Sequence, residues 1–378
     1  MTRSATTRPR RPAAPAAARI LIVRLGALGD VVRTLPAASA LRDHYAEAHL
    51  AWLVEAKSAG VLRSQPWIDE VLELPRAALS EALAGGRIGR LASELGRFAS
   101  ELRSRRFDLV VDFHSILKSG VASWLTRAPV RAGYAPPLGR EGSWWFANRR
   151  APSPAHPISR FARNAALVRA LGVEAPERSA PLQVSEAARA RADAALAESG
   201  LGRQSDWVAL HPGSSGRAAH KRWSVEGFAA LARALRAQRG LECRVLRGAG
   251  SEEQARAEAV VAASGGAARL APAGDGPDAL AALLARASLH VGGDSGPLHV
   301  ASLVGTPVVQ IMGSTHPVEN TPWPRTPWRR VRIPVACSPC RRGCAAAHCL
   351  SVVPPESVVE AALALLDETG GARVRLAG

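Results

Sequence analysis

Short apolar runs alternate with longer stretches of helical hydrophobic spacing along most of the chain. The runs predict strands buried on both faces of a parallel sheet, and the stretches between them predict the covering helices. In the first half, the predicted strands are residues 20–25, 50–54, 71–74 and 109–113, with a helix over 31–45. In the second half, the predicted strands are residues 208–211, 243–246, 289–291 and 308–312, with helices near 223–239, 251–264 and 277–287.

A polar, proline-containing stretch over residues 174–185 interrupts this series, which then begins again. We therefore predict an α/β protein with two Rossmann-like, doubly wound parallel-sheet domains, over residues 20–180 and 181–352, that face a central cleft. Residues 353–378 are expected to form a closing helix, over 355–367, and a tail. This helix is a candidate for packing back on the first domain.

Residues 1–19 are rich in arginine, alanine and proline and contain no acid, so we predict a disordered basic tail. The longest apolar runs, over residues 279–285 and 308–312, are far shorter than the roughly 20 residues that span a bilayer. We expect no transmembrane segment.

The net charge of +17 comes almost entirely from arginine, because only Lys57, Lys118 and Lys221 are lysines. The planar guanidinium suits phosphate and carboxylate partners, so an anionic substrate or a membrane surface fits the charge. A GC-rich genome explains the same composition equally well. Nucleic acid is disfavoured as a partner, because the basic residues are spread along the chain and few aromatic residues lie among them.

The first glycine-containing loop, RLGALGD over residues 24–30, directly follows the first predicted strand. Its glycines permit a tight turn and a close approach to a ligand. The spacing is not the G-x-G-x-x-G of dinucleotide-binding domains. Asp30 falls at the carboxyl end of the strand, where open sheets place their chemistry, although its type and position also fit a helix cap.

The second loop, HPGSSG over residues 211–216, offers Ser214, Ser215 and backbone amides to a phosphate. Lys221 and Arg222 follow at the start of the next predicted helix. These cations would neutralise a diphosphate, although a solvated basic turn explains them as well.

The third loop, over residues 292–299, lies between a predicted strand and a helix. Asp294 or Ser295 can cap that helix, and the free amides near Ser295 and Gly296 suit an anion. His299, one turn further on, could reach the same anion or be structural. A fourth loop leads to Glu252, which could accept ribose hydroxyls or favour a helix start through its charge.

Taken together, the motifs RLGALGD, HPGSSGRAAHKRW and GDSGPLHVA and the cysteine-rich tail resemble glycosyltransferase family 9, the heptosyltransferases. The resemblance extends over nearly the whole chain after residue 19, and the order of the motifs is more specific than any one of them. It implies the GT-B architecture and a donor, usually ADP-heptose, bound mainly by the C-terminal domain. The chain departs from the family pattern at two positions: it has Ser295 where threonine is frequent and Ser224 where proline is common. These departures leave the subfamily open, and with it the acceptor.

The resemblance also implies a role for each matching residue. Asp30 corresponds to the general base, and Lys221 to the residue that binds the donor diphosphate. Glu252 corresponds to the ribose ligand, with Glu253 as an adjacent candidate. The remaining matches, to the diphosphate and sugar, are Asp294, Ser295, Gly296 and His299.

The expected function is inverting, metal-independent transfer of heptose from ADP-heptose to the anionic lipopolysaccharide inner core. The chain contains no D-x-D triplet, so we expect no metal and no cofactor. We expect a cytoplasmic protein, with peripheral contact at the inner membrane. The alternatives are a family 9 enzyme with another nucleotide sugar or acceptor, a nucleotide-linked oxidoreductase that lacks the dinucleotide fingerprint, and a non-catalytic nucleotide-sugar binding protein.

Four cysteines, Cys337, Cys340, Cys344 and Cys349, lie within thirteen residues. Their spacing could serve zinc or disulfides, although zinc sites usually separate two pairs more widely and a cytoplasmic protein disfavours disulfides. A similar tail is common in family 9, where it is interpreted as structural.

Overall fold

The computed structural model describes residues 14–175, 182–202, 205–214, 216–248, 250–274, 276–340, 343–344 and 346–370. Most of the predicted basic tail and the predicted boundary between residues 180 and 181 therefore lie outside the described residues. The ordered first unit begins earlier than residue 20, because the Tyr45 hydroxyl donates to the carbonyl of Pro15 at 2.8 Å.

Two six-stranded sheets, all of whose strand pairs are parallel, confirm the predicted pair of Rossmann-like units. The first sheet has the order β3-β2-β1-β4-β5-β6 and the second β12-β11-β10-β7-β8-β9, which is the same winding order repeated. The strands are β1 (Arg19–Val23), β2 (His49–Val54), β3 (Glu70–Glu73), β4 (Leu109–Asp112), β5 (Val130–Tyr134), β6 (Arg149–Ala151), β7 (Trp207–His211), β8 (Glu242–Val245), β9 (Ala268–Leu270), β10 (Leu289–Gly293), β11 (Val308–Ile311) and β12 (Trp328–Val331).

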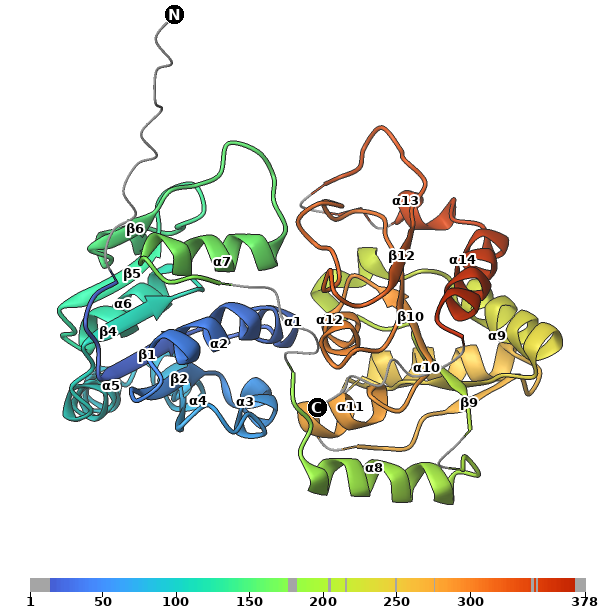
Figure 1. Cartoon of the computed structure of the whole chain (residues 1–378), viewed down its shortest axis with the longest axis horizontal. Coiled ribbons are helices and arrows are strands. Elements are labelled where there is room, and N and C mark those ends of the chain that lie inside the picture. Colours follow the sequence, from blue (N-terminus) through green and yellow to red (C-terminus); the bar gives the residue numbers. More distant parts are fainter. Residues whose placement is uncertain are drawn as a thin grey trace, which may run out of the picture.

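Helices cover both faces of each sheet (Figure 1). In the first unit they are α1 (Leu28–Val32), α2 (Leu35–His44), α3 (Ala56–Arg63), α4 (Arg76–Ala84), α5 (Ile88–Ser104), α6 (Leu117–Leu125), α7 (Arg160–Ala170) and the short 3₁₀ helix η1 (Ser143–Trp145). In the second unit they are α8 (Glu186–Glu198), α9 (Val225–Arg239), α10 (Ser251–Ala263), α11 (Gly276–Leu284), α12 (Gly296–Leu303), α13 (His348–Ser351), α14 (Pro355–Glu368) and the 3₁₀ helix η2 (Gly216–Lys221). Within the described residues, no helix combines the length and apolar character needed to cross a bilayer.

The alternation of side chains along β1 divides the first core into two layers. Ile20 and Ile22 belong to the apolar cluster that includes residues of α2 and α7. Leu21 and Val23 belong to the cluster on the opposite face, which includes residues of α5 and α6. All four side chains are buried, which explains why β1 is apolar at every position after Arg19.

Two predicted features differ from the structure. The single helix predicted over residues 31–45 is divided between α1 and α2, because Pro36 has no N–H to donate to the carbonyl of Val32. The closing helix α14 packs mainly on α9, β11 and β12 of the second sheet rather than on the first unit. Its Val358, Ala362 and Leu365 complete the second core.

The two units meet through their helices (Figure 1): α1 of the first unit packs on α12 of the second, and α3 of the first unit packs on α11 of the second. The α1–α12 contact is tight, because a Cβ atom on Gly29 would lie 3.2 Å from the Cα atom of Gly296. The loops that begin α1 and α12 are therefore neighbours.

Candidate active site

The predicted site loops follow the central strands of the two sheets. In each sheet the winding reverses between two neighbouring strands, β1 and β4 in the first and β7 and β10 in the second. The Asp30 loop follows β1, the His211 loop follows β7, and the Asp294 loop follows β10. Reversal points are where doubly wound sheets bind their ligands, so the topology places these loops where a site is expected.

Asp30 is held by three arginines. Its carboxylate lies 2.5 Å from Arg24, 2.6 Å from Arg33 and 3.2 Å from Arg160. Burial alone would raise the pKa of Asp30, but the guanidinium charges outweigh it and hold this pKa well below its usual value. The carboxylate is therefore ionised at neutral pH, and its side chain is 21% exposed.

Asp30 is not the helix cap that its type allowed. It is the third residue of α1, whose N-cap position is taken by Ala27. The pairing with Arg33 follows the i, i+3 spacing of a helix and was legible in the sequence. Arg160 comes from α7, 130 residues away in the chain, and no sequence signal identified it.

Lys221 and Asp294 form the centre of the second unit's site. The Lys221 ammonium lies 3.1 Å from one carboxylate oxygen of Asp294, and His299 Nε2 lies 3.3 Å from the other. Burial would raise the pKa of Asp294, but His299 and Lys221 hold it below its usual value. A Cβ atom on Gly293 would lie 2.8 Å from the carbonyl oxygen of Lys221, so only glycine permits this close approach.

His299 cannot supply a positive charge to an anion at neutral pH. It is fully buried, and burial together with Arg33 lowers its pKa to about 4, despite the opposing effect of Asp294. The neutral ring therefore orients Asp294. This favours the structural interpretation of His299 over direct phosphate binding.

Ser295 occupies the N-cap position of α12 but makes no side-chain cap, so neither predicted capping residue acts as one. Its hydroxyl lies 3.2 Å from His211 Nδ1 instead. Burial lowers the pKa of His211 to about 4, so this pair is neutral. The amides at the start of α12, including that of Gly296, receive no cap from Ser295.

Ser214 is committed to its own loop. Its hydroxyl donates to the carbonyl of Ala218 at 2.8 Å and accepts from Arg222 Nε at 3.1 Å. It therefore holds the loop and Arg222 in place. Ser215, the other predicted phosphate ligand, lies outside the described residues.

The two adjacent acids of α10 have different surroundings. Glu252 is 64% exposed and pairs with Arg222, whose NH2 group lies 3.1 Å from it. Glu253 lies among the loops after β7 and β8, because a Cβ atom on Gly213 would lie 3.0 Å from its carboxylate and one on Gly248 would overlap it. The geometry therefore favours Glu253 over Glu252 as the residue that faces a ligand at the strand ends.

A second cationic group surrounds Glu55, directly after β2. Lys118 lies 2.7 Å from its carboxylate, Arg76 2.8 Å and Lys57 3.4 Å. These cations overcome the effect of burial and lower the pKa of Glu55 to about 2. Three cations therefore share the carboxylate of Glu55. The three lysines of this arginine-rich chain all lie in segments that follow β2, β4 or β7.

The loop after β4 is fixed by a buried acid. Asp112 accepts from the amides of His114 and Ser115, both at 2.9 Å, and from the hydroxyl of Ser119 at 2.8 Å. Burial nevertheless raises the pKa of Asp112 to about 6. Asp112 lies in no glycine-containing motif, so no signal in the sequence pointed to this acid.

The described residues contain no group of three or more His, Cys, Asp or Glu side chains arranged to hold a metal ion. All five cysteines are described and all are free thiols, so the disulfide alternative for the C-terminal cluster is wrong for this structure. The pKa of Cys349 is raised by burial and by the nearby thiols of Cys340, Cys344 and Cys337.

Solved structures share the architecture of more than nine tenths of the chain. A glycosyltransferase family 9 structure from Veillonella parvula superposes with a TM-score of 0.72 at 22% identity, covering 93% of this chain and 97% of that one. The structure of E. coli heptosyltransferase WaaC with ADP gives a TM-score of 0.71 at 20% identity, covering 92% and 99%. The fold is therefore the GT-B fold of these enzymes.

Curated proteins similar to this chain are lipopolysaccharide heptosyltransferases. The chain is 24% identical to lipopolysaccharide core heptosyltransferase OpsX of Haemophilus influenzae, over 80% of this chain and 81% of that protein. It is 28% identical to lipopolysaccharide heptosyltransferase 1 of Pseudomonas aeruginosa, over 79% of each. The model of glycosyltransferase family 9 (heptosyltransferase) matches residues 95–349, well over half of the chain. The chain belongs to glycosyltransferase family 9 and is a glycosyltransferase.

Proposed function

We propose that the protein transfers a heptose from ADP-heptose to the inner core of lipopolysaccharide, with inversion at the anomeric carbon and without a metal. The names of the curated relatives support heptose as the sugar and lipopolysaccharide as the acceptor class. The solved relative with ADP supports an adenosine diphosphate leaving group. The observation that carries the proposal is the contact of α1 with α12, which makes the Asp30 loop and the Asp294 loop neighbours.

In this mechanism Asp30 receives the proton of the acceptor hydroxyl. A lone pair of that oxygen forms the new bond to the anomeric carbon, on the face opposite the diphosphate, and the proton passes to Asp30 as this bond forms. The bond between the anomeric carbon and the diphosphate oxygen breaks, and ADP leaves with the electron pair. Inversion follows from the opposite positions of the attacking and departing oxygens.

Lys221 and the first amides of α12 would stabilise the charge that develops on the diphosphate. An ammonium and oriented backbone amides can do this without a metal ion. Asp294 holds the ammonium at 3.1 Å, and His299 orients Asp294. Glu253 is the residue we assign to the ribose hydroxyls, since Glu252 faces Arg222.

The cationic group around Glu55 is suited to anionic parts of the acceptor. Lys57, Lys118 and Arg76 bring three positive charges to a single carboxylate, and their side chains are between 41% and 61% exposed. An acceptor phosphate or carboxylate would find excess positive charge there. We place the reaction at the cytoplasmic face of the inner membrane, where a lipid-linked acceptor and a nucleotide donor can meet.

The test is to incubate the purified protein with a panel of nucleotide sugars, core acceptors and excess chelator, and to identify products by mass spectrometry. Mass gain equal to one heptose, with release of ADP and a product anomer opposite to that of the donor, is the expected result. Loss of activity in chelator would refute the metal-free mechanism. Turnover of a nicotinamide cofactor, or donor binding without transfer to any core acceptor, would instead support the oxidoreductase or the binding-protein alternative.

A further inference from the structure

The helical hairpin of α4 and α5 carries an apolar stripe that is buried at one end and exposed at the other. In α5, Ile88, Leu91, Leu95, Phe98 and Leu102 recur at helical spacing and form one stripe. Phe98 and Leu102 are buried against the first sheet. Ile88 is 80% exposed and Leu95 39%, so the amino-terminal half of the stripe continues past the sheet into solvent.

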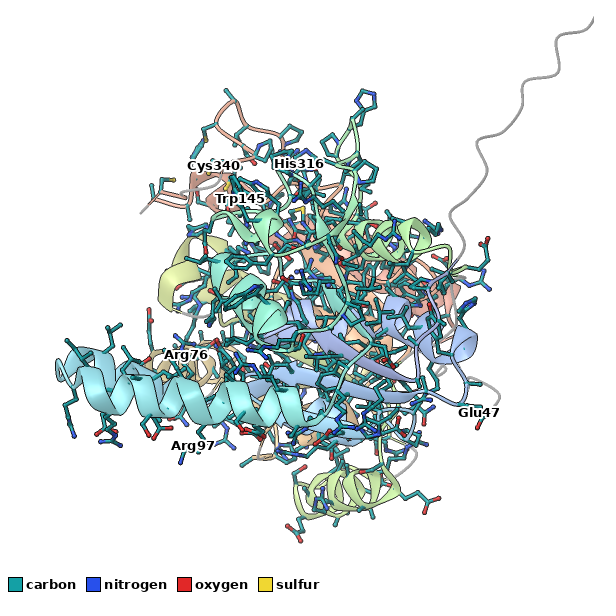
Figure 2. All side chains as sticks on the ribbon, turned by 90° about the vertical axis from the view of Figure 1, so that its left-hand side faces the viewer. Glu47, Arg76, Arg97, Trp145, His316 and Cys340 are labelled. Atoms are coloured by element: carbon teal, nitrogen blue, oxygen red, sulfur yellow. The ribbon has the colours of Figure 1, made fainter. Side chains whose placement is uncertain are left out.

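The tip of the hairpin adds to this exposed surface. Leu83, near the end of α4, is 70% exposed, and residues 83–90 are exposed at every position. Figure 2 shows α5 crossing the front of the first unit, with Arg97 labelled on it, and its free end extending beyond the body of the molecule. Six of the eight exposed large apolar side chains recorded for the described residues lie between residues 83 and 145, on α4, α5, α6 and η1.

Positive charge accompanies the apolar stripe. Arg87 and Arg90 lie 3.5 Å and 3.1 Å from the single carboxylate of Glu81, so the tip carries more positive than negative charge. Residues 76–150, which include these elements, contain 13 lysines and arginines against six acids. On the neighbouring α6, Trp124 is 55% exposed and lines a surface hollow with Arg103, Arg127 and Arg131.

We propose that this hairpin is the membrane-docking surface of the protein and binds an anionic lipid bilayer. An amphipathic helix with apolar residues on one face and arginines beside them lies in the interface of such a membrane, and charge complementarity favours anionic headgroups. The hairpin begins at Arg76, whose guanidinium pairs with Glu55 and belongs to the cationic group that we assign to the acceptor. Docking through the tip therefore holds the acceptor side of the first unit next to the lipid from which an acceptor would extend.

The first experiment is sedimentation of the full chain with vesicles, without donor or acceptor, so that its outcome is independent of the proposed function. We expect binding to vesicles of phosphatidylcholine with phosphatidylglycerol to exceed binding to phosphatidylcholine alone by about fivefold or more, and to weaken in high salt. The combined substitutions Leu83→Ser, Ile88→Ser and Leu95→Ser should lower the partition coefficient by at least about tenfold. These side chains are exposed, so circular dichroism and thermal unfolding should match the unaltered protein.

The matched control is the pair Val318→Ser and Ile333→Ser, which removes exposed apolar side chains from the second unit. It should bind vesicles within about twofold of the unaltered protein. Equal binding by the hairpin variant, equal binding to neutral vesicles, or no binding at all would overturn the proposal. A stable dimer in analytical ultracentrifugation that the hairpin substitutions dissociate, together with absence of vesicle binding, would assign the stripe to a second copy of the chain instead.

Discussion

Replacing Asp30 by Asn removes the proposed base and also the negative charge that three guanidiniums share. A positioned base contributes roughly 10² to 10⁴ in rate, which corresponds to about 3 to 5.5 kcal/mol of activation free energy. We therefore expect kcat to fall by that factor. The donor affinity should stay within about threefold, because the second unit supplies the donor contacts in the proposed mechanism.

The same substitution has a calculable cost in stability. Arg24 and Arg33 have side chains only 5% and 8% exposed, so Asp30→Asn leaves two nearly buried cations without their carboxylate. Removing one partner of a buried ion pair costs about 3 to 5 kcal/mol, and the 21% exposure of Asp30 places this case at or below the lower end. Activity must therefore be compared well below the unfolding temperature of the variant.

The pH dependence of this contribution follows from the direction of the shift. The pKa of Asp30 is lower in the folded state, so its stabilising effect is present above the unfolded value of about 4 and is lost as the pH falls below it. The stability deficit of Asp30→Asn should therefore be constant between pH 5 and pH 8. Protonation of Asp30 should not reduce the activity of the unaltered enzyme in that range.

The assay is release of ADP from ADP-heptose with a core acceptor, combined with calorimetric titration of ADP and urea unfolding. Asp367→Asn, which removes a 57% exposed carboxylate paired with Arg239, is the control and should leave turnover unchanged. Undiminished turnover in Asp30→Asn would refute the assignment of the base. A loss of ADP binding in place of a loss of turnover would show that Asp30 belongs to the donor site.

Three further predictions follow from the geometry. Lys221→Gln should raise the donor KM by about tenfold or more and also lower kcat, because it removes the charge paired with Asp294, and Lys221→Arg should recover part of the loss in steady-state kinetics. Glu253→Gln should weaken ADP binding by about tenfold in calorimetry, whereas Glu252→Gln should change it less than about twofold; the reverse order would return the ribose role to Glu252. Asp112→Asn keeps a side-chain acceptor for the loop amides and removes an acid whose pKa is raised to about 6. Because this pKa is higher in the folded state than in the unfolded state, the free energy of unfolding of the unaltered protein should fall by up to about 3 kcal/mol as the pH rises from 4 to 6. The variant should lose less over the same range, and urea unfolding measures both.

The fold was predictable because its central strands are apolar on both faces. The strands expected from the sequence in the first half, and the four in the second half, occur in the structure within a residue or two of their predicted ends. The strands β5, β6, β9 and β12 were not identified. β6 and β9 have only three residues each, and β12 reads WRRV, so charged edge positions interrupt the apolar run that marks a buried strand.

The candidate site was predictable only where a residue lies in a glycine-containing loop that follows a strand. Asp30, Lys221 and Asp294 each lie in a glycine-containing motif that follows a strand, and motif and strand together identified them. Arg160 and Glu55 carry no such motif, and their positions beside the site depend on how distant segments pack. Glu253 illustrates a finer limit, because a helix turns by about 100° per residue and only coordinates separate it from Glu252.

The arginines around Asp30 restrict the way in which that carboxylate can act as a base. A base is most effective when its pKa lies near the working pH, and the pKa of Asp30 lies well below it. It therefore cannot hold an appreciable fraction of the acceptor proton before the reaction begins. The hydroxyl becomes strongly acidic once its oxygen starts to bond to the anomeric carbon, and from that point an ionised carboxylate of low pKa can accept the proton. Proton transfer should consequently follow the onset of bond formation to the sugar, and the guanidiniums of Arg24 and Arg33 hold the ionised carboxylate in position until then.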